Sequence, residues 1–314
     1  MTRKMVSDLK AGEPVDEVFL LCKNELKRSR NDSLYLDLLF RDKSGTVAGR
    51  MWDASEKVYE AFSVDDFVHV KGRVEQYRDE VQISVKSLSQ PDMSKLRLRD
   101  FMAQSEREPL EMEKDLRQLL SVIQDPDYRR LVDAFLADEE FMAAFRTAPA
   151  AITNHHAYLG GLIEHTLSMM RLAVAVADNY PRLRRDILLT GVLLHDIGKV
   201  HEIRYNRSFQ MSDSGQLLGH LTQGAIMTQQ KAAALEGFPE EKLSLALHMI
   251  LSHHGAREFG SPVLPMTGEA LALHFIDNLD AKTKTVAEVV DADGNSRSAF
   301  TNYVSNLDRR LYKK

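Results

Sequence analysis

Residues 186–199, DILLTGVLLHDIGK, set the architecture of the longer part of this chain. Their apolar side chains recur at helical spacing, which predicts a buried helix that ends at the pair His195-Asp196. Burying these two polar side chains costs free energy unless each has an oppositely charged or hydrogen-bonding partner or binds a metal ion. The stretch therefore indicates a polar or metal-binding site inside a helical domain, although a single His-Asp dipeptide is not specific.

Helical periodicity continues on both sides of this motif. Asp125-Pro126 has the form of a helix cap followed by proline in the first turn. Residues 203–218 are polar and predict a loop or a short hairpin between helices. We therefore predict an all-α helical bundle over residues 113–300, with helices over 160–179, 182–195, 219–235, 240–254 and 268–290.

The first ninety residues follow a different pattern, in which apolar and polar residues alternate as in strands. Five strands with one helix, at 55–62, between the third and the fourth is the order of an OB-fold β-barrel. The sequence thus predicts a multidomain α and β protein whose five-stranded barrel occupies residues 12–90. A barrel that serves only as a scaffold or dimer contact is the alternative. The predicted strands are 18–23, 34–40, 47–51, 67–72 and 81–85.

Two further segments complete the predicted organisation. Residues 91–112 are charged, lack a periodic pattern and are bounded by two prolines, so we place a linker there. Residues 301–314 form a basic C-terminal tail, and such tails are usually solvated.

The composition excludes several classes of protein. The 314 residues are 44% hydrophobic and 28% charged, which is typical of globular chains. Lys and Arg number 41 against 46 Asp and Glu, and the resulting net charge of −5 argues against a general coat for nucleic acid. No apolar run reaches the ~18 residues of a membrane span, and the single Cys22 excludes an intrachain disulfide. We expect a cytoplasmic protein without membrane association, and a homo-oligomer is left open.

Seven side chains in the helical part have the character of metal ligands. Most lie at predicted helix ends, where polar groups from several helices can converge on one point. Imidazole and carboxylate without thiolate favour a catalytic site for Mn²⁺, Fe²⁺, Co²⁺ or Zn²⁺ over a structural zinc site. We predict one or two divalent ions, which could generate hydroxide and hold a phosphoryl group, with Asp196 as a bridge. The candidates are His165, His195, Asp196, His220, His253, His254 and Asp277.

Lys199, three residues after Asp196, has two interpretations. Its ammonium group could stabilise charge on a phosphate oxygen, so that Asp196 and Lys199 are the predicted catalytic residues. Alternatively, it is a helix-end lysine that interacts with the helix dipole.

Together the motifs resemble a known superfamily. His165, HDIGK (195–199), GH (219–220), HH (253–254) and Asp277 follow the pattern of the HD superfamily of metal-dependent phosphohydrolases. Longer stretches are similar to the YhaM family of 3′→5′ exoribonucleases, namely HHAYLGGLIEHT (155–166), YPRLRRDILLTGVLLHDIGK (180–199), GQLLGH (215–220), HMILSHHGAREFGSP (248–262) and EALALHFIDNLDAK (269–282).

This resemblance implies an OB-fold before an HD domain, and degradation of single-stranded RNA from its 3′ end with Mn²⁺ or a similar ion. In some members single-stranded DNA is also a substrate. The resemblance further implies that His155 and His156 lie at the cavity rim and contact the substrate, with loop packing as the alternative. The ligands implied for a first metal are His165, His195, Asp196 and Asp277, and those for a second are His220, His253 and His254.

The predicted barrel offers a second place for nucleic acid. Residues 23–30 join its first two predicted strands, a position at which OB-folds bind oligonucleotides. We select Lys27, Arg28 and Arg30 as substrate contacts ahead of the aromatic residues, most of which could belong to the core. Residues 12–90 hold 12 Lys and Arg against 15 Asp and Glu, so the contact has to be local.

Three functions compete at this level. The first is a metal-dependent 3′→5′ exoribonuclease that releases 5′-nucleotides one at a time. The second is a phosphohydrolase of small nucleotides or cyclic dinucleotides, but the Gly-Tyr-Pro motif of the cyclic-dinucleotide group does not occur in the chain. The third is a single-strand-binding protein with an inactive HD site. We disfavour it because every ligand position holds a competent residue.

Overall fold

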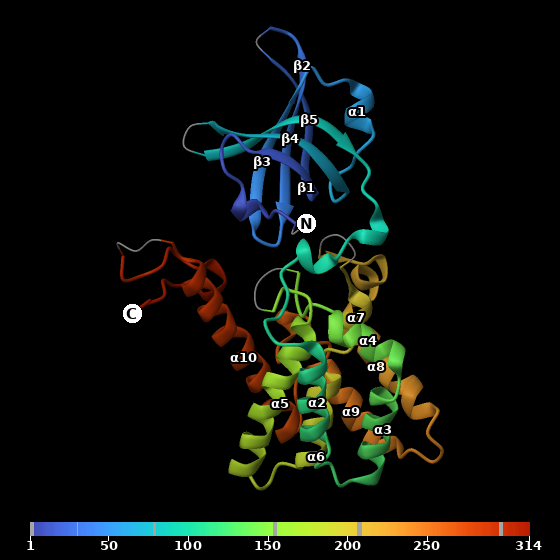
Figure 1. Ribbon diagram of the computed structural model, residues 1–314. Helices are drawn as coiled ribbons and strands as arrows, with labels where there is room; N and C mark the ends of the chain where they lie inside the picture. Colours follow the sequence, from blue (N-terminus) through green and yellow to red (C-terminus); the bar gives the residue numbers. More distant parts are fainter. Residues whose placement is uncertain (1–2, 30, 78–79, 153–155, 206–208, 295–297) are drawn as a thin grey trace. The chain divides into compact units, whose positions relative to one another are not determined.

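The computed structural model describes residues 3–29, 31–77, 80–152, 156–205, 209–294 and 298–314 (Figure 1). The chain divides into two compact units, of which the first extends to Ala103 and the second starts at Gln104. The division falls inside the predicted linker.

The N-terminal unit is a closed barrel of five strands. The strand order is β1-β2-β3-β5-β4, and pairing of β1 with β4 closes the barrel. Among the described strands of the barrel, β3 and β5 pair in parallel and the other pairs are antiparallel. This is the strand order of an OB-fold, which confirms the predicted fold of this unit. The elements are β1 (Pro14–Arg28), β2 (Leu34–Asp42), β3 (Gly45–Trp52), α1 (Glu56–Glu60), β4 (Phe67–Tyr77) and β5 (Glu80–Ser89), after a 3₁₀ turn at Val6–Asp8.

Strand β2 shows how the sequence produces the barrel. Alternate side chains of a strand point to opposite faces of the sheet. Leu36, Leu38 and Phe40 are accordingly buried in the barrel core, whereas Asp37 and Leu39 between them are only partly buried.

Strand β1 is longer than the sequence predicts, so the loop assigned to residues 23–30 is mostly strand. It continues to Arg28. The ammonium groups of Lys23 and Lys27 both bind the carboxylate of Asp37 on β2, at 2.9 Å and 2.6 Å. Cross-strand ion pairs of this kind stabilise the charged end of β1. The alternation of apolar residues does not predict this end, because its side chains are polar.

The segment 91–112, predicted as a linker, contains ordered structure. Two 3₁₀ turns, Met93–Lys95 and Leu98–Asp100, precede Phe101, whose buried ring packs against Phe67 with 4.6 Å between centroids. Helix α2 already begins at Pro109. Proline is favoured at the first position of a helix, where its missing N–H group is not needed.

The C-terminal unit is a bundle of helices around one apolar core, as predicted. It also contains a small antiparallel sheet of β6 (Ile203–Arg204) and β7 (Gln210–Met211), which lies in the segment predicted as a loop or hairpin. None of the described helices is long and apolar enough to cross a membrane. The helices are α2 (Pro109–Leu120), α3 (Pro126–Leu136), α4 (Glu139–Thr147), α5 (Gly161–Asn179), α6 (Arg185–Leu194), α7 (Lys199–Glu202), α8 (Asp213–Ala233), α9 (Glu240–Ser252) and α10 (Gly268–Ala292).

Helix α8 starts earlier than predicted and is broken in its first third. Ser212 caps it by accepting a hydrogen bond from the backbone of Gly215. Gly219 then interrupts the helix with φ +69° and ψ 158°, a conformation that glycine adopts without steric cost. The break turns the chain so that His220 begins a second helical piece.

Candidate metal centre

The seven predicted ligands lie together in the C-terminal unit. Their ligand atoms form three overlapping groups, and within each group all atoms lie within 4.8 Å of one another. The ligands come from the first turns of α5, the chain after α6, the middle of α8, the chain after α9 and the middle of α10. The groups are His165, His195 and Asp277; His195, Asp196 and His253; and His220, His253 and His254.

Asp196 occupies the centre of this arrangement and is 1% exposed. Its Oδ2 lies 3.3 Å from Nε2 of His195 and 3.8 Å from Nε2 of His165. Its Oδ1 lies 3.4 Å from Nε2 of His220 and 3.6 Å from Nε2 of His253. One carboxylate therefore faces two separate groups of imidazoles, which is the arrangement of a bridging ligand.

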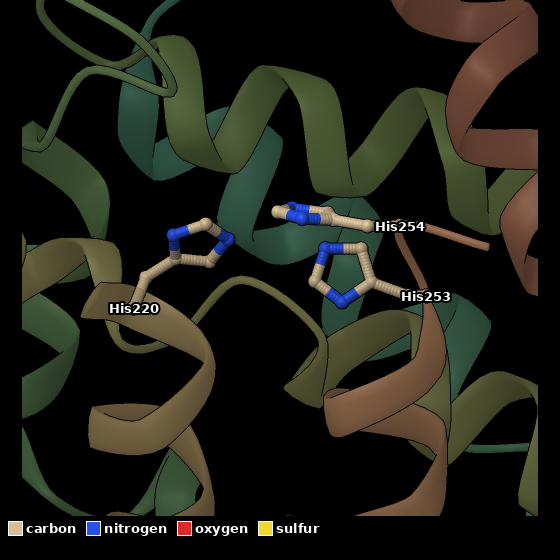
Figure 2. Close-up of side chains that lie close together, drawn as sticks. All are labelled: His220, His253 and His254. Carbon is tan, nitrogen blue, oxygen red and sulfur yellow. The ribbon is translucent and has the colours of Figure 1, made fainter. Parts of the chain in front are cut away.

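The pair His253-His254 can contribute two ligands because α9 ends before it. The helix stops at Ser252, and Gly255 turns the chain with φ +79°. The two rings lie 4.5 Å apart, and both face His220 (Figure 2). On a regular helix adjacent side chains point about 100° apart, so this convergence depends on the helix end.

The five imidazoles are oriented in the same way. Each uses Nδ1 for a hydrogen bond to a backbone carbonyl or a carboxylate, which leaves Nε2 for the centre. Such bonds fix the tautomer and the ring orientation of metal-binding histidines. The Nδ1 partners are the carbonyls of Val192 for His195, Ile250 for His253 and Phe259 for His254, and the carboxylates of Asp280 for His165 and Glu202 for His220.

Two observations show that the residues fit divalent ions. Oδ1 of Asp196 and Nε2 of His220 are buried, and neither has a hydrogen-bond partner within the described residues. A buried polar atom without a partner costs about 1–3 kcal/mol, a cost that a bound ion removes. In addition, ligands about 2.1 Å from one ion stand about 3.0–3.4 Å apart, and the separations of 3.3–3.8 Å around Asp196 are close to that range.

Electrostatics prepares the same groups for metal binding. Burial lowers the pKa of His253 and of His254, so both rings are neutral at neutral pH and keep a lone pair for an ion. Burial also opposes the charged form of His165, but the carboxylates of Asp277 and Asp280 outweigh it and raise the pKa of His165 to about 9. A metal ion would displace that proton, so metal binding by this site releases protons.

A cavity of about 400 Å³ is lined by five of the seven candidate ligands, namely His165, Asp196, His253, His254 and Asp277. Lys199 lies in its wall, with its ammonium nitrogen 2.6 Å from Oδ2 of Asp196. The burial of Lys199 disfavours its charge, but the carboxylate of Asp196 outweighs this and raises the pKa of the lysine, which stays protonated at neutral pH. A fixed cation therefore faces the cavity beside the proposed bridging carboxylate, which favours the first interpretation of Lys199.

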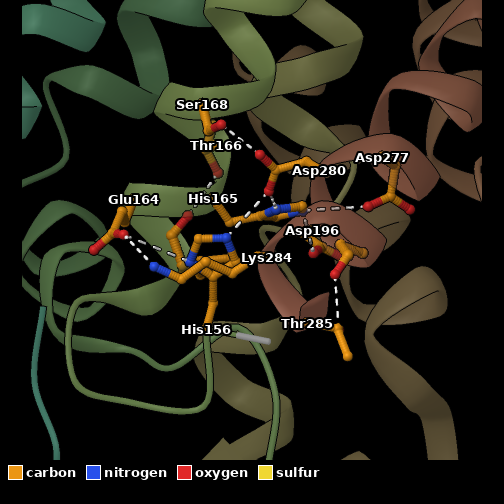
Figure 3. A network of polar contacts seen from close by, with 12 residues as sticks. His156, Glu164, His165, Thr166, Ser168, Asp196, Asp277, Asp280, Lys284 and Thr285 are labelled. Atoms are coloured by element: carbon orange, nitrogen blue, oxygen red, sulfur yellow. Dashed lines mark hydrogen bonds and ion pairs between the residues drawn. The ribbon is translucent and has the colours of Figure 1, made fainter. Parts of the chain in front are cut away.

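Asp280 and His156 lie beside the candidate ligand His165 (Figure 3), and neither is among the residues that line the cavity. Oδ2 of Asp280 accepts a hydrogen bond from Nδ1 of His165 at 2.7 Å and from Nε2 of His156 at 3.1 Å, and Ser168 donates to its Oδ1. His156 is 2% exposed. The prediction that it contacts substrate at the rim does not fit this burial, and its contacts indicate that it helps to orient His165.

Sequence reasoning missed the two carboxylates that bind the rings of candidate ligands, Asp280 at His165 and Glu202 at His220. Asp280 follows Asp277 by three residues, which places both on one face of α10. That spacing was the available signal. Glu202 accepts hydrogen bonds from both the backbone and the ring of His220, and only the fold brings them together.

The remaining predicted substrate contacts have different outcomes. Arg30 and His155 lie outside the described residues. Lys27 is held by Glu25 and Asp37, and Arg28 forms an exposed ion pair with Asp32. Lys27 would have to exchange these carboxylates for phosphate in order to bind RNA.

Asp280→Asn tests the orienting role of this carboxylate. We expect metal affinity to fall by about 10–100-fold, because the variant no longer holds His165 with a charged acceptor. Titration calorimetry with Mn²⁺ measures the change, and Asp291→Asn, an exposed carboxylate on the same helix, is the matched control. Unchanged affinity in Asp280→Asn would show that the orientation of His165 does not depend on it.

Comparison with known proteins supports both units. A family model described as HD domain matches residues 162–282. A second model, described as OB-fold nucleic acid binding domain, matches residues 24–90. Fold and site thus define a protein in which an OB-fold precedes an HD domain with a candidate centre for divalent ions.

Relatives that match most of the length of this chain define the family more closely. The 3′-5′ exoribonuclease YhaM of Geobacillus sp. (strain WCH70) is 34% identical over 315 residues, covering 99% of this chain and 95% of the relative. The protein of that name from Bacillus subtilis (strain 168) is 34% identical, covering 96% and 95%. The one from Bacillus velezensis is 36% identical, covering 86% of each chain. The chain belongs to the YhaM family of 3′-5′ exoribonucleases.

Proposed function

We propose that this chain is a metal-dependent 3′→5′ exoribonuclease that hydrolyses single-stranded RNA and releases 5′-nucleotides. The observation that carries the proposal is Asp196, whose two oxygens face two groups of imidazoles at the base of a cavity. The direction of digestion and the polymer substrate follow the names of the relatives. Single-stranded DNA is a second substrate class under the same proposal.

Divalent ions in this site, with Mn²⁺ as our proposed ion, would lower the pKa of a bound water and neutralise phosphoryl charge. Neutral His253 and His254 keep their lone pairs directed at the centre. The protonated Lys199 is available to offset negative charge on a non-bridging phosphate oxygen, where such charge develops during hydrolysis. The free thiol of Cys22 is compatible with the cytoplasmic location that we propose.

The barrel supports a polymer substrate over a small one. The exposed ring of Trp52 lies 5.0 Å from the ring of Tyr35, and the Arg50 guanidinium lies 5.6 Å from the centroid of Tyr35. Aromatic rings beside a cation are the groups with which OB-folds hold single strands. We propose that this group, with Lys27 and Arg28, binds RNA.

One assay tests the proposal against its alternatives. The protein is incubated with Mn²⁺ and 5′-labelled single-stranded RNA, and separately with nucleoside phosphates and cyclic dinucleotides. We expect a ladder of products that shortens from the 3′ end. Turnover of the small substrates alone would instead assign a small-molecule phosphohydrolase, and RNA binding without turnover would assign an inactive binding protein.

A further inference from the structure

Residues 298–314, called the C-terminal segment below, are folded rather than a solvated tail. The backbone amide of Thr301 donates to the carbonyl of Leu311 at 2.9 Å, and that of Val304 to the carbonyl of Arg309 at 2.8 Å. Both Thr301 and Leu311 are buried. Lys313 forms an ion pair of 3.2 Å with Asp293, which follows directly after α10. The segment is therefore a small hairpin fixed to the helix that carries Asp277.

This hairpin forms part of the wall of the metal cavity. Asn306 and Leu307 line the cavity together with His165, Asp196 and Asp277. The match to the HD domain ends at residue 282, so the hairpin is an addition beyond the matched domain. Lys282, on α10, adds a cation to the same cavity wall.

The surface of the C-terminal segment has the chemistry of a single-strand-binding site. The segment holds four Lys and Arg against one Asp, a net charge of +3 in a chain whose total is −5. Arg309 and Arg310 are exposed. The rings of Phe300, Tyr303 and Tyr312 are 48%, 59% and 59% exposed. Cations that follow the phosphates and rings on which bases stack are the two components of sites for single strands.

We propose that the C-terminal segment binds single-stranded RNA just upstream of the 3′ end, with Arg309 and Arg310 on phosphates and Tyr303 and Tyr312 under bases. The proposal rests on the proposed exoribonuclease function and adds to it the surface that holds the strand while its 3′ end occupies the cavity. Charge complementarity and continuity with the metal cavity select RNA as the occupant.

The test compares two double variants of the full chain. Arg309→Ala/Arg310→Ala removes two of the four cations of the segment, and Lys114→Ala/Arg182→Ala removes two exposed cations outside the lining of the cavity. We expect the first to raise KM for an RNA of about 20 nucleotides roughly tenfold and to leave kcat and the cleavage of dinucleotides unchanged. The slope of log Kd against log salt, from fluorescence anisotropy of a cleavage-resistant RNA analogue with Mn²⁺ present, should fall by about 1.4, because single strands lose about 0.7 per phosphate contact.

The aromatic part is tested by Tyr303→Ala and Tyr312→Ala. Each should weaken binding of the long RNA about fivefold or more, and the corresponding phenylalanine variants should restore it, since stacking needs only the ring. If the wild type digests RNA but both arginine variant and control bind it equally, the proposal for this segment is wrong. If the wild type neither binds nor digests RNA, the proposed function itself is wrong.

Discussion

Asp196→Asn should lower kcat for RNA digestion by about 10³-fold or more. The substitution keeps the shape of the side chain but removes the charge that faces both imidazole groups, at 3.3 Å from His195 and 3.4 Å from His220. Loss of metal-dependent stabilisation is worth several kcal/mol, and each 1.4 kcal/mol changes a rate tenfold. Single-turnover digestion at saturating Mn²⁺ measures the effect.

Asp178→Asn provides the matched control, because Asp178 is exposed and forms a surface ion pair with Arg185. It should digest RNA at the wild-type rate. Circular dichroism of both variants reports whether the fold is retained. A folded Asp196→Asn variant with turnover within tenfold of wild type and unchanged metal content would contradict the bridging role.

Lys199→Met should lower kcat by about 10²–10³-fold while metal binding is kept. The Lys199 ammonium lies in the cavity wall, and the raised pKa keeps it charged at neutral pH. Loss of one group that stabilises developing negative charge typically costs this much. Pre-steady-state digestion measures kcat, and calorimetry with Mn²⁺ measures metal affinity in the same variant.

Lys242→Met is the corresponding control, because Lys242 is also held by carboxylates, those of Asp125 and Asp127, but lines a different cavity. Its kcat should equal that of the wild type. If Lys199→Met changes only the free energy of unfolding, the lysine acts on its helix end rather than on the reaction, which is the second interpretation of its sequence position.

The sequence predicted the architecture because local patterns determine most of it. Alternation along residues 34–40 produced strand β2, and the apolar period of 186–199 produced the helix before His195. Ligands that end helices were also recognisable, since charge at the end of an apolar run has few explanations other than a partner or an ion. These features need only the neighbouring residues.

Other features depend on residues that are distant in sequence. The burial of His156 follows from its bond to Asp280, 124 positions later, and the strand at Lys27 follows from Asp37. The hairpin of the C-terminal segment is likewise fixed by Lys313 and Asp293 through contacts without a periodic signal. The periodicity of apolar residues does not predict contacts between residues that only the folded chain brings together.

Oδ1 of Asp196 and Nε2 of His220, which have no hydrogen-bond partner among the described residues, have a consequence for the stability of the protein in a cell. An ion held by these residues would bind the native chain in preference to the unfolded one, so its supply would affect the folding equilibrium. An ion at a hundred times its dissociation constant adds about 2.7 kcal/mol to the native state. A shortage of the ion would then lower the number of folded molecules as well as the activity of those that remain folded. The unfolded molecules would be degraded.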